Sequence, residues 1–191
     1  MQMGISQVDL AILLPAFAAA WSLVGGQTAF ATQESSGRAY RSPDGFFSVE
    51  TPAGWELCTQ EDSNEVTFLN GKVSVSVAAA ETEAGDTVDQ ILEFNKCLVR
   101  HLCPAGEVWS EGKATVAGAP GAYFTMYCPA QRERTIVRVA AALIRRKMYI
   151  FKIAAPNAEL HAVQATIDRM AQSFKACDGL PQGSEPRRQA C

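Results

Sequence analysis

The side chains best suited to chemistry in this sequence belong to six cysteines and two histidines. Cys97 and His101 are four residues apart in a segment with helical periodicity, so we expect both on one outer helix face. Cys103 lies just beyond them. An imidazole stabilises a neighbouring thiolate, and both groups bind zinc. This spacing predicts either a reactive thiolate–imidazole pair or part of a Cys/His metal site.

A plainer interpretation of the same residues is a disulfide beside a solvent-facing histidine. No third orienting group and no fourth ligand stand at a diagnostic spacing from the pair, and the sequence has no Cys-x-x-Cys redox motif. His161 points away from the apolar stripe of its own predicted helix, which is typical of a surface residue. We therefore predict no catalytic residue, no metal site and no cofactor, with a cysteine-dependent enzyme or redox protein as an alternative.

The N-terminal segment has the pattern of an export signal. Leu10 to Thr32 carries no charge, and its apolar centre, residues 11–24, has the length of a signal-peptide core. Small residues flank Phe30 at the two positions that signal peptidase reads, which predicts a cut after Ala31. We expect a signal peptide over residues 1–31 and a periplasmic or secreted protein. Because residues 1–9 hold no Lys or Arg, an uncleaved N-terminal membrane anchor is the alternative.

All six cysteines lie beyond the predicted cut, and disulfides are common in exported domains. Residues 177–191 begin and end with cysteine and have turn-forming composition, so one disulfide would hold this tail. The sequence alone does not choose among the pairings. The disulfide candidates are Cys58, Cys97, Cys103, Cys128, Cys177 and Cys191.

Between leader and tail the chain is predicted to form a polar linker, residues 32–39, and a single domain, residues 40–176. Two amphipathic helices are expected, one capped by Asp86-Thr87 and ending before Pro104, the other opening at Pro156-Asn157. Asn70-Gly71 is the favoured central pair of a type I′ hairpin. Period-two alternation predicts strands at 47–51, 55–58, 66–68, 73–77, 108–116, 122–127, 135–144 and 148–154. This order predicts an α+β fold in which helices cover an antiparallel sheet.

Basic residues are concentrated in one segment of an otherwise acidic chain of net charge −3. Arg132, Arg134 and Arg138 have even spacing, so a strand would present them on one face, with the other basic residues on the following turn and strand. The set is Arg132, Arg134, Arg138, Arg145, Arg146, Lys147 and Lys152. We expect this surface to bind an envelope protein or an anionic surface component. A merely solubilising sheet face is the alternative, and the lack of interleaved aromatic residues argues against nucleic acid.

Aromatic residues are the remaining candidates for a binding site. Trp55, Trp109 and the Phe46-Phe47 pair could line a ligand cleft. Because they alternate with polar residues along predicted strands, we expect them in the core instead.

The segment from Tyr40 to Trp55, which runs from an aromatic strand into a Pro-x-x-Trp turn, resembles the opening of PsbP-like proteins. The order of elements, the hairpin at 118–121 and a last helix ending in Ser173-Phe174 are similar too. The resemblance extends over residues 40–176 and implies an α/β/α sandwich. It also implies an accessory or binding role, because members of this family are not catalysts. The cysteine-bounded tail is a departure from that pattern.

Together these observations predict an exported, non-catalytic accessory protein of the cell envelope that binds a protein or an anionic surface partner. A small-molecule or lipid carrier with a cleft between sheet and helix is an alternative, and it requires an unfilled apolar cavity. The cysteine-dependent enzyme is the third hypothesis. Membrane association is expected only if the leader stays uncleaved.

Overall fold

The computed structural model describes residues 31–34, 39–59, 65–129 and 134–177. An eight-stranded antiparallel sheet with the order β1-β4-β5-β6-β10-β9-β8-β7 forms the centre, and β11-β3-β2 form a second, smaller sheet. The helices are α2 (Val88–Leu102) and α3 (Asn157–Ser173). The strands are β1 (Ala31–Glu34), β2 (Ala39–Arg41), β3 (Phe47–Glu50), β4 (Glu56–Thr59), β5 (Glu65–Asn70), β6 (Val73–Glu81), β7 (Glu107–Val116), β8 (Ala119–Cys128), β9 (Thr135–Ile144), β10 (Lys147–Pro156) and β11 (Lys175–Ala176).

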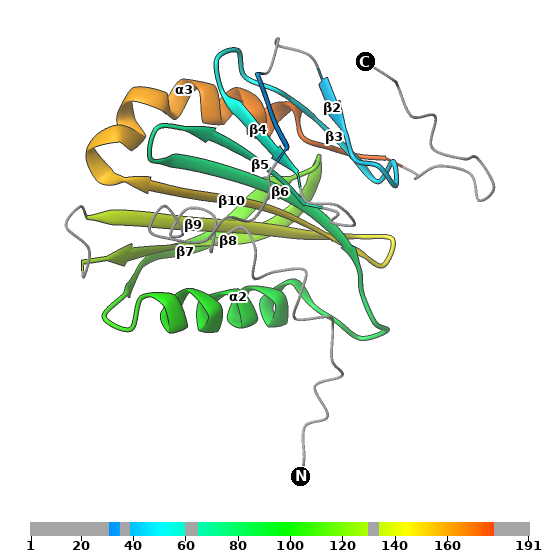
Figure 1. Ribbon diagram of the computed structural model, residues 1–191. Helices are drawn as coiled ribbons and strands as arrows, with labels where there is room; N and C mark the ends of the chain where they lie inside the picture. Colours follow the sequence, from blue (N-terminus) through cyan, green and yellow to red (C-terminus); the bar gives the residue numbers. More distant parts are fainter. Residues whose placement is uncertain (1–30, 35–38, 60–64, 130–133, 178–191) are drawn as a thin grey trace.

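The two helices lie on opposite faces of the large sheet, α3 above it and α2 below it in Figure 1. Side chains alternate between faces along a strand, and directly paired residues share a face. Phe151 of β10 therefore packs on the α3 side, whereas its neighbour Ile150 packs on the α2 side. The predicted antiparallel sheet covered by helices is confirmed.

The larger core lies between the big sheet, α3 and the three-stranded sheet. Phe174, which directly follows α3, meets Phe47 of β3 edge to face with ring centroids 5.7 Å apart, and it also contacts Tyr149 and Phe151 of β10. Edge-to-face aromatic pairs contribute about 1 kcal/mol each beyond the area they bury. This cluster fixes both the end of α3 and the small sheet onto the large one.

The second core lies between α2 and strands β8, β9 and β10. The helix begins where the sequence predicts, because Thr87 and Gln90 form a reciprocal capping box. Lys96, which is nearly buried, donates to Glu93 at 2.7 Å and to Glu111 of β7 at 2.6 Å. Those two carboxylates, that of Glu111 first, raise the pKa of Lys96. The ion pair joins α2 to the edge strand of the sheet.

One predicted hairpin has a different turn. Asn70 pairs with Val73, so Gly71 and Lys72 occupy the two central positions. Only Gly71 has a positive φ, +57°, which is the φ pattern of a type II′ turn. The hairpin is confirmed, but the type I′ turn centred on Asn70-Gly71 is wrong. The turn between β9 and β10 is less favourable, because its two central residues, Arg145 and Arg146, are not glycines and have positive φ values of 50° and 64°.

The ends of the domain differ from the prediction in one respect. Residues 31–34, which straddle the predicted cut and the start of the linker, form β1 and pair with β4, for example Thr32 with Cys58. The remainder of the leader and residues 178–191 lie outside the described residues. Within the described ranges, no helix is long and apolar enough to cross a membrane.

The close approach of β8 to β9 gives a direct test of this packing. A Cβ atom on Gly121 would lie 2.1 Å from the backbone oxygen of Ala141. We expect Gly121→Ala to lower the free energy of unfolding by about 3 kcal/mol, measured by urea denaturation. Gly54→Ala is the control, because Gly54 has φ +76° but open space around it. It should cost only about 1 kcal/mol. Equal losses in the two variants would contradict the register of β8 and β9.

Candidate functional site

One part of the large sheet is left uncovered on the α3 side. There α3 packs mainly against β3, β10 and β6 (Figure 1). Strands β8 and β7 continue past this cover to the edge of the sheet. Their outward side chains on this face include Tyr123 and Tyr127, which are half-buried, and Trp109, which is 59% exposed.

Trp109 is exposed because the ladder between β7 and β8 is irregular at this point. The register shifts between Val108 and Ser110, which leaves Trp109 as the extra residue of a β-bulge. Its ring then stacks on that of Tyr127, with centroids 5.2 Å apart and planes 12° from parallel. The expectation that Trp109 lies in the core is wrong, while Trp55 and Phe47 are buried as predicted.

Arg138 lies on the same face, one strand further in. It pairs directly with Thr125 of β8, and its Nε donates to the Thr125 hydroxyl at 3.1 Å. The guanidinium lies over the ring of Tyr123, 5.6 Å from the centroid. No carboxylate in the described part of the chain forms an ion pair with it. These two contacts orient the Arg138 side chain, which remains exposed to solvent.

Gly112 makes room for this arrangement. It is opposite Tyr123 in the β7–β8 ladder, and a Cβ there would lie 3.3 Å from the Tyr123 ring. The tyrosine therefore lies across the edge strand. We call Trp109, Tyr123, Tyr127 and Arg138 the aromatic–arginine face. These residue types dominate the binding energy of protein interfaces, and a guanidinium pairs in bidentate fashion with a carboxylate.

The predicted basic surface is divided between distant places. Arg132 lies outside the described residues, and Arg134 is exposed just before β9. Arg145 and Arg146 form the turn at the opposite end of β9, about 30 Å away at the usual rise per residue. Beside that turn Lys147 pairs with Glu81 at 3.3 Å and lies over the Phe46 ring, 3.2 Å from its centroid.

Lys152 does not belong to any exposed surface, which corrects the prediction. It pairs with Val139 rather than Arg138, so it faces the α2 side of the sheet. Its ammonium group lies 3.1 Å from Glu65 of β5, and both side chains are 5% exposed. The alternation of a strand separates Arg138 and Lys152 onto opposite faces, so the seven basic residues cannot act as one patch.

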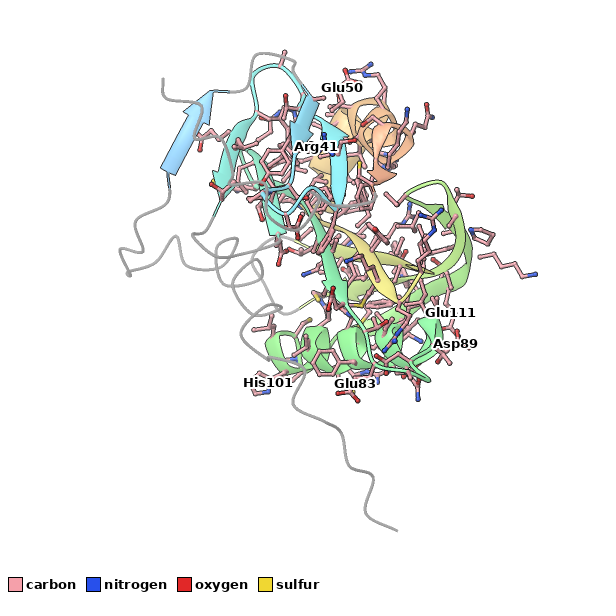
Figure 2. All side chains as sticks on the ribbon, turned by 90° about the vertical axis from the view of Figure 1, so that its right-hand side faces the viewer. Arg41, Glu50, Glu83, Asp89, His101 and Glu111 are labelled. Atoms are coloured by element: carbon pink, nitrogen blue, oxygen red, sulfur yellow. The ribbon has the colours of Figure 1, made fainter. Side chains whose placement is uncertain are left out.

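Cys97 and His101 are both exposed on the outer face of α2, as predicted. His101 projects away from the sheet in Figure 2. No hydrogen bond joins the two side chains, and no group of three or more His, Cys, Asp or Glu that could hold a metal ion occurs in the described ranges. Cys97 and His101 thus have no third group that would orient them for catalysis. His161 is exposed too.

The described cysteines are all thiols in this structure. Cys58, Cys103 and Cys128 are buried, Cys177 is half-buried, and Cys191 lies outside the described residues. Burial, followed by the charge of Glu56, raises the pKa of the Cys58 thiol. A protonated, buried thiol is a poor nucleophile. The expected pairing of most cysteines is therefore not formed among these five.

A cavity of about 340 Å³ lies between α3 and the turn that joins β3 to β4. Its walls include the buried Trp55 and Met170, but also Glu50 and Arg169. Glu50 lies next to α3 in Figure 2. This is the location that the carrier hypothesis requires, between helix and sheet. However, its charged residues differ from the apolar lining that a lipid carrier needs.

The architecture defines a PsbP/Mog1-like α+β fold. A solved structure of cyanobacterial PsbP (CyanoP) from Synechocystis sp. PCC 6803 is similar, with a TM-score of 0.53 and 15% identity over 80% of this chain and 96% of that one. The Saccharomyces cerevisiae Ran-binding protein Mog1p has a TM-score of 0.51 and 12% identity over 76% and 95%. A protein from Bacteroides thetaiotaomicron has a TM-score of 0.54 and 14% identity over 79% and 51%. No protein-family model and no curated protein sequence matches the chain.

The fold agrees with the predicted resemblance to PsbP-like proteins. At these identities the likeness defines the architecture alone. The aromatic–arginine face was missed as a unit because its members come from three strands. The sequence signal for it is the Tyr-x-Thr-x-Tyr alternation from Tyr123 to Tyr127, which places both rings on one face.

The Lys152–Glu65 pair provides a test of the corrected placement. We expect Lys152→Met to lower the free energy of unfolding by about 3 kcal/mol, because it leaves the Glu65 carboxylate buried without its counter-charge. The double variant Lys152→Met/Glu65→Leu should regain most of that loss. Thermal or urea denaturation measures both. A loss below about 0.5 kcal/mol for Lys152→Met, as at a solvent-facing position, would contradict the burial.

Proposed function

We propose that this protein is an exported, non-catalytic binding protein that contacts a protein partner through the aromatic–arginine face. The observation that carries the proposal is Trp109, a large aromatic side chain 59% exposed on an uncovered sheet face and stacked on Tyr127. Exposing a tryptophan to water is unfavourable, and a partner that covers it gains the corresponding hydrophobic free energy. The rigid stack also loses little side-chain entropy on binding.

Arg138 determines the chemistry of the proposed partner. The Tyr123 ring and the Thr125 hydroxyl hold the guanidinium in place before binding. A preorganised arginine with no ion pair among the described residues favours an Asp or Glu on the partner, adjacent to an apolar side chain that covers Trp109. The partner is therefore an acidic protein surface with an apolar centre. This retains the predicted envelope-protein partner but moves the contact from the basic segment as a whole to Arg138 and its aromatic neighbours.

Two other hypotheses have weaker support. The charged cavity walls at Glu50 and Arg169 argue against a lipid carrier, although a small polar ligand fits the volume. Cys97 and His101 lack the third group that would orient a nucleophile and its base. Export and the periplasmic or secreted location rest on the leader pattern of residues 1–31.

Affinity capture from the envelope of the source cell tests the binding proposal. We expect Trp109→Ala to weaken capture of the partner about 30-fold, the effect of a hot-spot residue. Arg138→Ala should weaken capture about tenfold at low salt. The difference in affinity between the wild type and this variant should become smaller at higher salt, because salt screens the charge of Arg138. Arg138→Lys should bind the partner more tightly than Arg138→Ala but more weakly than the wild type, because lysine keeps the charge but lacks the planar guanidinium.

Arg100→Ala is the matched control, since Arg100 is an exposed arginine on α2, on the other side of the sheet. It should leave capture unchanged. A partner that binds Trp109→Ala and Arg138→Ala as tightly as the wild type would refute this surface. Equal losses in Arg100→Ala and Arg138→Ala would show a general charge effect instead.

Export has its own test. If signal peptidase cuts after Ala31, N-terminal sequencing of protein recovered from the envelope or medium should begin at Thr32. The cut removes one residue of β1 and leaves its other three pairs with β4 in place. An intact terminus at Met1 in the membrane fraction would support the uncleaved anchor and reject the cut.

A further inference from the structure

Two buried cysteines from different elements lie in the core between α2 and the large sheet. Cys103 caps the C-terminal end of α2 and is 2% exposed, and Cys128 is the last residue of β8 and is fully buried. Both belong to the core between α2 and the sheet. A Cβ on Gly106 would lie 3.1 Å from both the Cys103 sulfur and the end of the Met126 side chain, so Cys103 lies beside β8. The pairing of Glu107 with Tyr127 brings Gly106 next to Cys128, and this places the two thiols close together. Neither cysteine belongs to the aromatic–arginine face.

The backbone holds both residues in place. The Cys103 N–H donates to the Val99 carbonyl at 2.8 Å, and the Cys103 carbonyl accepts from the Gly106 N–H at 2.8 Å. A Cβ on Gly106 would lie 3.1 Å from the Cys103 sulfur, so this glycine leaves the space that the thiol occupies. Cys128 is fixed by its ladder position opposite Thr135.

The other described cysteines cannot reach this pair. Cys58 lies on β4, five strands from β8 in the sheet order, which is about 24 Å at the usual strand spacing. Cys97 faces solvent on the outer side of α2. The Cys177 thiol instead lies 3.8 Å from the Ser48 hydroxyl of β3.

We propose that Cys103 and Cys128 form a structural disulfide that joins α2 to β8 when the protein folds in an oxidising compartment. One S–S bond forms as two S–H bonds break. The two electrons and two protons pass to an oxidant that is itself a disulfide, which is reduced to two thiols. The bond closes a loop between two elements already in contact, so its main effect is on the unfolded chain.

The timing of the reaction follows from burial. Burial, and then the contact with Cys103, raises the pKa of Cys128 to about 12, so this thiol is protonated in the folded protein at neutral pH. Both cysteines are buried, so an oxidant in solution does not reach either sulfur once the chain has folded. Only a thiolate attacks a disulfide. Oxidation must therefore take place during folding, while the thiols are accessible. The folded, reduced protein should resist the same oxidant.

The test is to refold the denatured, reduced full chain with a glutathione redox buffer, block free thiols with iodoacetamide, and digest with trypsin without reduction. Residues 101–113 and 114–132 are separate tryptic peptides with one cysteine each. We expect these two peptides to be joined by a disulfide. Carbamidomethyl groups on both cysteines, glutathione on either, or a bond from either to another cysteine would overturn the proposal.

A stability measurement separates a native disulfide from an incidental one. We expect wild-type protein refolded with glutathione to melt about 10 °C higher than protein refolded with dithiothreitol. Cys97→Ser, the matched control, should show the same difference. Cys103→Ala/Cys128→Ala should show none. An equal difference in this double variant, or a lower melting temperature for the oxidised wild type, would reject a native bond. If the double variant does not fold, the peptide map of the wild type and of Cys97→Ser decides alone.

Discussion

The antiparallel register across β10, β9 and β8 determines what every side chain of this sheet can contact. Ile153, Arg138, Thr125 and Ser110 form one row across four strands, from the core under α3 to the open edge. The adjacent row, Lys152, Val139, Phe124 and Glu111, faces α2. A shift of one residue in this register would turn Arg138 toward the core under α2 and Lys152 toward the core under α3. Core, ion pairs and binding surface therefore depend on the same set of backbone hydrogen bonds.

The same constraint explains why one surface stays open. The centre of the sheet is buried on both faces, whereas α3 reaches only as far as β10 and β6 on its own side. The edge is protected from pairing with another sheet by the bulge at Trp109 and by Lys113, rather than by a covering element. Both features disfavour pairing at the edge, while the rings of Trp109 and Tyr127 lie on the face of the sheet. This arrangement suits side-chain recognition better than strand addition to the edge.

The sequence was sufficient for both helices, for β3 to β10 and for the architecture, because helix caps and period-two alternation are local signals. It did not predict the short strands β1, β2 and β11. Thr87 marked the start of α2, and the strand ranges agree within a few residues. The errors arise where the outcome depends on a partner strand. Trp109 alternates like a core residue, but the bulge turns it outward. Lys152 is basic like Arg138 and lies on the next strand, but the register places it opposite Val139, on the other face of the sheet.

The candidate site was harder to predict than the fold for a related reason. The predicted basic surface consisted of residues that are neighbours along the chain, whereas the surface of a sheet is formed by residues that are neighbours on adjacent strands. Arg138 meets the rings of the aromatic–arginine face because Tyr123 and Thr125 are its neighbours on β8.

The proposed disulfide and the proposed binding face are linked through β8. Cys128 directly follows Tyr127, so a bond to α2 on one face would anchor the strand next to the Trp109–Tyr127 stack on the other. Alternation separates the two functions cleanly, since the sulfur points into the core and the ring toward solvent. A strand fixed from below presents its aromatic side chains with little freedom, and such preorganisation lowers the entropic cost of binding. In the proposed arrangement the disulfide holds the strand from one face, and the stack on the other face stays available to a partner.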